Sequence, residues 1–566
     1  MRGGTKLLLW NEQLLAVSED EVHAWAEEAS PAPWWSRHAN SLALLGGFLL
    51  AFGEIVLNLL SGDDVVDAVW PHAVRSLGWT MALRASPALP FTLVMVLGVA
   101  AFFGRGLVQR SPRQGRLEVG LHTAVGFLLG LLSIHFVMDA AYLRGAFLLL
   151  PTLYGWTLAV LLVVVGGLPT WRSAETGAFS WPKTAHLVGV FFAAWLVMPG
   201  IPALVGMAPA PPDAPRIGYG STPGPYDTLQ FSSPYTLPEA VVAVQGDLED
   251  DVTFSVHLTL PDLPDDTPLA TVPLAVLLHG FGYPDVDAYQ AWITHLAAKG
   301  IAVAFLQYPS DLRPEGHETF DERYEEGTSN FLQHTYRNLS IRAAMDHLEM
   351  LALSEPRDER IDQAIGDVMI DPSSLWVGGH SLGAAYTFLS LDEAFDRGWG
   401  QHALVVALEA PASRPMQVEL QHDFTRMPTN TLVQIAVSED DMSVGICPGA
   451  FHQQQFASLP EERNQLIVVR TDKYGFPRLV ASHYMQTDPA HDRLSDWGFY
   501  RRIDAQADYI VAQGRNDTFT ADFAFQYMTD ETMLTGMGQW EDGTPVLPLK
   551  LFHDGLNTDA MFEACT

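Results

Sequence analysis

The 566-residue sequence contains only two cysteines, Cys447 and Cys565. Neither has the paired spacing of a metal site, and no HExxH, Walker or GxGxxG pattern occurs in a suitable context. We therefore expect neither a metal nor a nucleotide cofactor. The two cysteines form a disulfide or stay free thiols, because the sequence does not show whether they lie close enough to bond.

Basic residues are scarce in the second half of the chain. Residues 1–209 carry 12 Lys and Arg against 13 Asp and Glu, a net charge of −1. Residues 210–566 carry 20 against 53, a net charge of −33. A segment with this much negative charge repels nucleic acids and anionic membrane surfaces. We therefore exclude nucleic acid as a partner.

The amino terminus lacks the basic start, brief apolar core and small-residue cleavage site of a removable signal peptide. Residues 1–40 instead hold mixed charges and several tryptophans. We expect them to form an amphipathic or loosely ordered segment.

Residues 41–207 contain long apolar runs. Most of these runs approach the roughly 20 residues that a membrane-spanning helix needs. The five runs are Ser41–Leu60, Pro87–Phe103, Val119–Met138, Gly145–Gly167 and Ala185–Met207. Trp and Tyr gather near their ends, as anchors at a membrane interface do. The few charged residues in this stretch could not cover five such helices in water. We therefore predict an all-α membrane domain of about five transmembrane helices.

The distribution of Lys and Arg predicts the orientation of this domain. Nine of them lie in the amino-terminal tail and the second-to-third and fourth-to-fifth loops, and three lie on the opposite side. This bias places the amino terminus in the cytoplasm. An odd number of spans then places the second half outside the cytoplasm, in a compartment that permits a disulfide.

Four ionisable residues lie inside or at the edge of the apolar runs: Glu54, His122, His135 and Asp139. Such residues are costly in lipid and can mark a pathway or a site. A polar cluster that bonds the helices together explains them as well, so their role stays open.

Residues 208–225 are rich in Pro and Gly and are expected to form a semi-extended linker. Strands and helices then alternate through residues 226–566, a pattern typical of a mostly parallel sheet covered by helices. The predicted strands are Ala240–Gln245, Val252–Leu260, Leu274–Leu278, Ile301–Leu306, Leu375–Val377, Leu404–Leu408, Thr431–Val437 and Gln465–Val469. The predicted helices include Ala288–Lys299 and one from about Phe331 to Leu353.

The segment Gly379-His380-Ser381-Leu382-Gly383 fits the G-x-S-x-G nucleophile elbow, in which a serine sits on a sharp turn between a buried strand and a helix. Leu375–Val377 suits the strand, and Ala384–Leu389 continues as an apolar helix. The glycines are needed because side chains at their positions would collide with the strand or the helix. Ser381 is therefore the candidate nucleophile.

The segment His279-Gly280-Phe281-Gly282 directly follows the predicted strand Leu274–Leu278. In an elbow-type hydrolase, the oxyanion hole takes one backbone N–H from this loop and one from the residue after the nucleophile. Phe281 and Leu382 are the matching donors. Two such donors can lower the barrier by several kcal/mol.

A catalytic serine needs a histidine to take its proton and an acid to orient that histidine. In this fold they follow in the order serine, acid, histidine. Strand Thr431–Val437 ends in Ser438-Glu439-Asp440-Asp441; we favour Asp441 as the acid, with Asp440 and then Glu409 as alternatives.

For the base we favour His483, which follows the last strand, over His452 and His491. His380 is adjacent to the nucleophile in sequence, and we expect it to shape the pocket.

From about Gly218 to Leu549 the chain resembles α/β-hydrolases of the chlorophyllase, dienelactone-hydrolase and PAF-acetylhydrolase-like group, and most of all bacterial members of unknown substrate. The resemblance rests on LLHGFG, YQAWITHLAAKGIAVAFLQYP, VGGHSLGAA, SEDDMSVG, DKYGFPRLVASHY and MGQWEDGTPV. It implies a triad of Ser381, Asp441 and His483, in agreement with the choice made above. The membrane half lies outside the resemblance.

These patterns together predict a membrane-anchored, extracytoplasmic serine hydrolase of small-molecule or lipid esters. An acyltransferase with the same triad differs only in which acceptor reaches the acyl-enzyme, and a non-catalytic receptor on a hydrolase fold is a further alternative. The acyl chain, the head group and the oligomeric state cannot be read from the sequence.

Overall fold

The computed structural model describes two short strands near the amino terminus, most of the helical first half and most of the second half. The described residues are 6–10, 13–17, 38–63, parts of 65–78, 88–108, 113–142, 148–166, 170–173, 177–221, 223–244, 253–264, 270–312, 328–412, 424–554 and 560–565. Everything from Trp195 to the carboxyl terminus falls in one compact unit.

A nine-stranded sheet organises the second half, in the order β11-β10-β9-β8-β7-β5-β6-β4-β3. The strands are β3 (Asp227–Pro234), β4 (Ser255–Asp262), β5 (Thr271–Leu278), β6 (Ala302–Leu306), β7 (Met369–His380), β8 (Ala403–Glu409), β9 (Leu432–Ser438), β10 (Asn464–Val469) and β11 (Lys550–Phe552). The six neighbouring strands β10, β9, β8, β7, β5 and β6 are parallel, and antiparallel pairs flank them at both edges.

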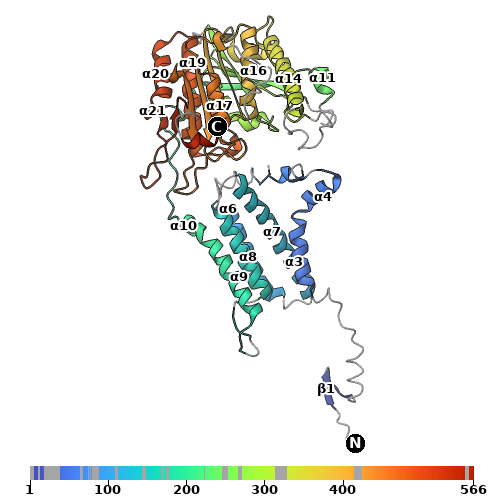
Figure 1. Cartoon of the computed structure of the whole chain (residues 1–566). Helices are drawn as coiled ribbons and strands as arrows, with labels where there is room; N and C mark the ends of the chain where they lie inside the picture. Colours follow the sequence, from blue (N-terminus) through green and yellow to red (C-terminus); the bar gives the residue numbers. More distant parts are fainter. Residues whose placement is uncertain are drawn as a thin grey trace. The chain divides into compact units, whose positions relative to one another are not determined.

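Helices cover both faces of this sheet (Figure 1). One face carries α14 (Thr328–Ala352), α15 (Glu359–Ile365), α16 (Leu382–Asp396) and α17 (Cys447–Gln455); the other carries α12 (Gln290–Ala297), α19 (Arg501–Gly514) and α20 (Thr518–Thr529). The short helix α18 (Arg493–Ser495) comes before α19 in the chain, and the short helix α21 (Glu531–Thr535) comes after α20.

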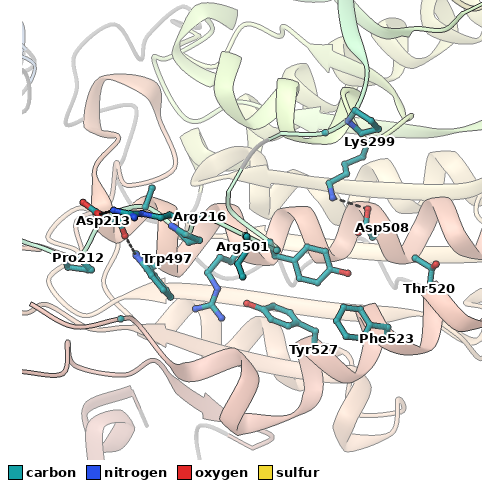
Figure 2. A pocket seen from close by; sticks show the side chains of 18 of the residues that line it. Pro212, Asp213, Arg216, Lys299, Trp497, Arg501, Asp508, Thr520, Phe523 and Tyr527 are labelled. Atoms are coloured by element: carbon teal, nitrogen blue, oxygen red, sulfur yellow. Dashed lines mark hydrogen bonds and ion pairs between the residues drawn. The ribbon is translucent and has the colours of Figure 1, made fainter. Parts of the chain in front are cut away.

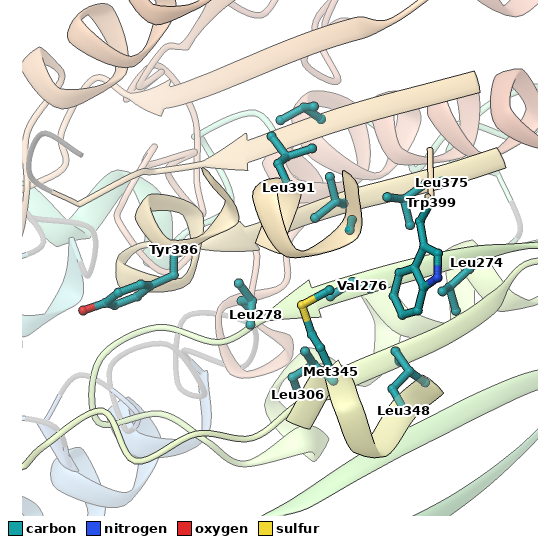
Figure 3. Packing of buried hydrophobic residues seen from close by; sticks show 14 of the residues in the cluster. Leu274, Val276, Leu278, Leu306, Met345, Leu348, Leu375, Tyr386, Leu391 and Trp399 are labelled. Carbon is teal, nitrogen blue, oxygen red and sulfur yellow. The ribbon is translucent and has the colours of Figure 1, made fainter. Parts of the chain in front are cut away.

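Strand β5 is apolar without interruption because it is buried on both faces of the sheet. Leu274, Val276 and Leu278 pack into the core beneath α14 and α16, together with Met345 (Figure 3). Leu277, which points the other way, packs into the core beneath α12 and α19. A strand buried on both faces needs apolar residues at every position. The strand order and directions fit the α/β-hydrolase fold that the sequence predicts.

One predicted strand is wrong. Residues 239–242, at the start of the predicted strand Ala240–Gln245, form the short helix α11 (Glu239–Val242). Pro238 precedes this helix as its N-cap residue. Strand β4 pairs with β3, a strand that was not predicted from the sequence.

The predicted linker is attached to the sheet-bearing domain. The Pro209 carbonyl accepts a hydrogen bond from the Phe476 N–H (2.9 Å). The Asp213 carbonyl accepts one from the Trp497 indole (2.9 Å). Residues 209–220 therefore run along the surface of the domain.

A disulfide joins Cys447 to Cys565, with 5.3 Å between their Cα atoms. Of the two possibilities that the sequence left open, the structure shows the bonded one. The bond ties the carboxyl-terminal segment to α17 and closes a loop of 118 residues.

The helical first half consists of α3 (Ala39–Leu50), α4 (Gly53–Ser61), α6 (Ala88–Val108), α7 (Gln114–Tyr142), α8 (Leu149–Gly166), α9 (Trp181–Val197) and α10 (Ile201–Leu204). Among the described residues, two helices are long and apolar enough to cross a membrane, Gln114–Ala141 and Trp181–Leu204. Ala39–Leu50 and Gly53–Ser61 make a third candidate if this pair, bent by 60°, is one span.

These helices coincide with the third, fifth and first predicted spans. The fourth predicted span falls on the shorter apolar helix Leu149–Val164. The second falls on α6, some of whose side chains lie outside the described residues. Two long apolar helices suggest association with a membrane, and the count of five spans stays a prediction.

Candidate active site

Ser381 lies on the turn between β7 and α16, with φ of 56° and ψ of −119°. A non-glycine residue in this backbone conformation is strained by about 1–3 kcal/mol. A Cβ atom at Gly379 would lie 2.6 Å from the Gly383 carbonyl carbon, and one at Gly383 would lie 2.4 Å from the Leu278 carbonyl oxygen. The two glycines are therefore required for the tight strand-to-helix turn that holds the serine.

A continuous line of hydrogen bonds runs from Ser381 through His483 to Asp441. The distance from Ser381 Oγ to His483 Nε2 is 2.8 Å, and from His483 Nδ1 to Asp441 Oδ2 it is 2.7 Å. Because the carboxylate can only accept, Nδ1 carries the proton and the Nε2 lone pair faces the serine hydroxyl. This tautomer is the one that a general base for the serine needs.

The Asp441 carboxylate is held as an anion by its surroundings. Burial acts to raise its pKa, but His483 and the backbone N–H groups of Ser443 and Val444 outweigh burial and hold the pKa below its ordinary value. Those two N–H groups donate to Asp441 Oδ1 at 2.8 and 3.0 Å. Both carboxylate oxygens are thus engaged, and the side chain is oriented toward the histidine.

The alternative acids have other partners. The Asp440 carboxylate lies 3.3 Å from Lys473 Nζ. Glu409 forms a buried, two-pronged ion pair with Arg502, at 2.8 and 2.9 Å. The structure brings neither carboxylate to His483.

The alternative bases also lie elsewhere. His452 is buried on α17, 3.2 Å from the Ala412 carbonyl oxygen. His491 Nε2 lies 2.6 Å from the Asp496 carboxylate. Of the three histidines weighed as the base, His483 is the one that reaches Ser381.

His380 belongs to a network that the sequence analysis did not foresee. Its Nε2–H donates to the His483 carbonyl oxygen (2.8 Å), so its Nδ1 accepts from the Tyr289 hydroxyl (3.0 Å). The same hydroxyl accepts from the Gly280 N–H (3.0 Å). Burial lowers the pKa of His380 to about 3. A neutral His380 thus joins the main chain of His483 to the loop that carries Phe281.

Tyr289 opens the motif YQAWITHLAAKGIAVAFLQYP, but nothing in the sequence predicts a contact between its hydroxyl and His380. Only the packing of the segment before α12 against the elbow brings its hydroxyl to His380.

The His279–Gly282 loop lies directly over the elbow. A Cβ atom at Gly280 would lie 3.3 Å from Ser381 Cβ, so glycine allows the close approach of the loop to the serine. His279 fixes the loop: its Nδ1 donates to the Gly280 carbonyl at 2.7 Å, and its ring stacks on Tyr308 at 4.2 Å. Burial lowers the pKa of His279 to about 4, so it is neutral near pH 7.

The second predicted oxyanion donor, Leu382, is the first residue of α16. The first N–H groups of a helix have no partner within the helix and point outward from its amino end. The Leu382 N–H therefore has no partner within α16. In the described part of the chain, no group of three or more His, Cys, Asp or Glu side chains is placed to hold a metal ion.

Comparisons with family models and with curated proteins find no match. Solved structures with some likeness include a thermostable esterase from Pseudomonas putida ECU1011, at 14% identity over 51% of this chain and 85% of that one, with a TM-score of 0.30. An esterase from Rhizomucor miehei shares 14% identity over 53% and 86%, with a TM-score of 0.29. A bacterial heroin esterase shares 15% over 54% and 86%, with a TM-score of 0.27. Because these identities and TM-scores are so low, the chemistry of this site has to be inferred from its own geometry.

Proposed function

We propose that the chain is a membrane-anchored serine hydrolase that cleaves carboxylic esters through an acyl-serine intermediate. The observation that carries the proposal is the line of hydrogen bonds from Ser381 through His483 to Asp441. Its distances, its burial and the tautomer that it imposes suit a serine nucleophile with a base and an orienting acid. The motif resemblance to the chlorophyllase and dienelactone-hydrolase group is part of the same proposal.

The reaction begins when Ser381 Oγ attacks the ester carbonyl carbon and His483 Nε2 takes the hydroxyl proton. Asp441 stabilises the imidazolium that forms. The backbone N–H groups of Phe281 and Leu382 donate to the oxyanion of the tetrahedral intermediate. Collapse of that intermediate expels the alcohol, which takes the proton from His483. Water then attacks the acyl-serine with His483 again as base, and the carboxylic acid leaves.

We further propose that the membrane helices anchor the hydrolase domain outside the cytoplasm, where lipid or lipophilic esters would be within reach. The Lys and Arg bias of the first half favours this orientation. The disulfide between Cys447 and Cys565 also favours it, since disulfides persist in oxidising compartments. Alkaline phosphatase fused after Thr566 should be active, and fused within Arg105–Arg116 it should be inactive. The reverse pattern would overturn the orientation.

Labelling with a fluorophosphonate probe tests the chemistry, because the probe reacts with an activated serine. Ser381→Ala and His483→Ala should each abolish labelling and the turnover of a p-nitrophenyl ester. The double variant should lose no more than either single one, because the serine is poorly nucleophilic without its base.

Ser390→Ala is the matched control, since Ser390 is a buried serine of the same helix α16. It should label like the wild type. Wild-type turnover in Ser381→Ala would remove the hydrolase proposal. Transfer of the acyl group to added alcohols, in preference to water, would identify an acyltransferase.

A further inference from the structure

A groove of about 1030 Å³ lies on the sheet face that α19 and α20 cover (Figure 2). Residues 212–219 of the predicted linker form one wall, and side chains of α19 and α20 form the other. The triad residues are not among its lining residues, so the groove is separate from the candidate active site. A volume of this order is that of a small-molecule site.

The groove has an aromatic wall. The Tyr219 ring lies 4.7 Å from the Tyr527 ring and 6.2 Å from the Phe523 ring, measured between centroids. Phe519 and Ile217 also line the groove and are 82% and 89% exposed. Large apolar side chains gathered at one exposed place mark a binding surface more often than a random patch.

The charges in the groove do not balance. Asp213 pairs with Arg216. Lys299 pairs with Asp508 at 3.0 Å, which leaves Arg501 as the remaining charged lining residue. No carboxylate of the described residues lies within ion-pair distance of its guanidinium.

Arg501 is only 8% exposed, and its guanidinium lies 5.0 Å from the Trp497 ring and 5.4 Å from the Tyr527 ring (Figure 2). It donates to two backbone carbonyls at the end of α21, those of Met533 (2.9 Å) and Gly536.

A buried cation without a counter-ion is costly, and partial charges on two carbonyls offset only part of the cost. The guanidinium has five N–H donors in a planar fork, more than the two carbonyls and the neighbouring Tyr527 hydroxyl use. An anion beside Arg501 would supply the missing counter-charge. A planar fork suits a carboxylate, which it can hold through two hydrogen bonds.

We propose that this groove binds a small amphipathic monocarboxylate, with its carboxylate on Arg501 and its apolar body against Phe519, Phe523 and Tyr527. The apolar wall supplies contact area, and the buried cation selects the anion over a neutral molecule of the same shape. The proposal does not depend on the reaction at Ser381.

The test uses the full chain in nanodiscs and two probes of equal shape, naphthalene-2-carboxylate and naphthalene-2-methanol. Isothermal titration calorimetry measures binding, and titrations of empty nanodiscs are subtracted. The wild type should bind the carboxylate at least about tenfold more tightly than the alcohol, because the two differ by one charge-assisted pair. Equal affinity for both probes, or no binding of either, would overturn the proposal.

Two substitutions separate the apolar and the charged contributions. Phe523→Ser should weaken both probes by about tenfold, the effect of losing one aromatic contact. Arg501→Gln should remove the preference for the carboxylate and leave the binding of the alcohol unchanged. Met350→Ser, at an apolar residue of α14 that is 58% exposed, is the matched control and should change neither affinity. Because Phe523 is 50% exposed, its variant should fold even if Arg501→Gln does not. If Phe523→Ser binds like Met350→Ser, the groove is not the site.

Discussion

Acid should destabilise the hydrolase domain through His380 in particular. This side chain is 2% exposed, and burial lowers its pKa to about 3, against about 6.5 in the unfolded chain. Between these two values the unfolded chain binds a proton that native His380 does not. Lowering the pH through this window therefore favours unfolding. For this one group, the free energy of unfolding should fall by about 2 kcal/mol between pH 7.5 and pH 5.

His380→Gln isolates this contribution. Glutamine can donate an amide N–H to the His483 carbonyl and can accept from the Tyr289 hydroxyl, and it does not titrate. The variant should therefore lose about 2 kcal/mol less than the wild type over the same pH interval, whatever its stability at pH 7.5. His402→Gln, at an exposed histidine, controls for the loss of an imidazole.

Pulse proteolysis of the full chain in urea, at both pH values, measures the two free energies. The disappearance of the uncleaved second half of the chain measures the unfolding of the sheet-bearing domain. If the wild type and His380→Gln show the same pH dependence, the burial of a neutral His380 does not cause the acid sensitivity.

Three further experiments test the site and the contacts that support it. Asp441→Asn should lower kcat by about 10⁴-fold, whereas Asp440→Asn should have little effect; ester turnover measures both, and the opposite ranking would reassign the acid. Tyr289→Phe should lower kcat about tenfold with little change in KM, since it removes a hydroxyl that links the oxyanion loop to the elbow. An equal rise in KM would place its effect on substrate binding instead. Replacing Cys447 and Cys565 by Ser should lower the free energy of unfolding by up to about 5 kcal/mol, the chain-entropy value for a loop of 118 residues. Unchanged resistance to pulse proteolysis would contradict this.

Much of the fold follows from patterns confined to short stretches of sequence. Continuous apolar runs indicate strands buried on both faces, and β5 is one. The elbow is equally local, because the glycines on either side of Ser381 are needed by a strand-to-helix turn whatever the rest of the chain does. A short segment with weak signals is different. Ala240–Gln245 has strand-like residues, yet the structure has α11 there and pairs β4 with β3.

The choices within the site depended on contacts between distant residues. Asp440 and Asp441 are neighbours with the same chemistry, and only the direction of each side chain in the folded turn separates them: one reaches Lys473 and the other His483. Tyr289 reaches His380 across 91 residues, and Cys447 reaches Cys565 across 118.

The groove likewise exists because the linker folds back over α19 and α20, although its composition predicts only an extended segment. Hydrophobic periodicity and turn residues determine local structure, because both act between residues that are close in sequence. Hydrogen-bond direction, ion pairing and closure of a groove arise only when separate segments pack together.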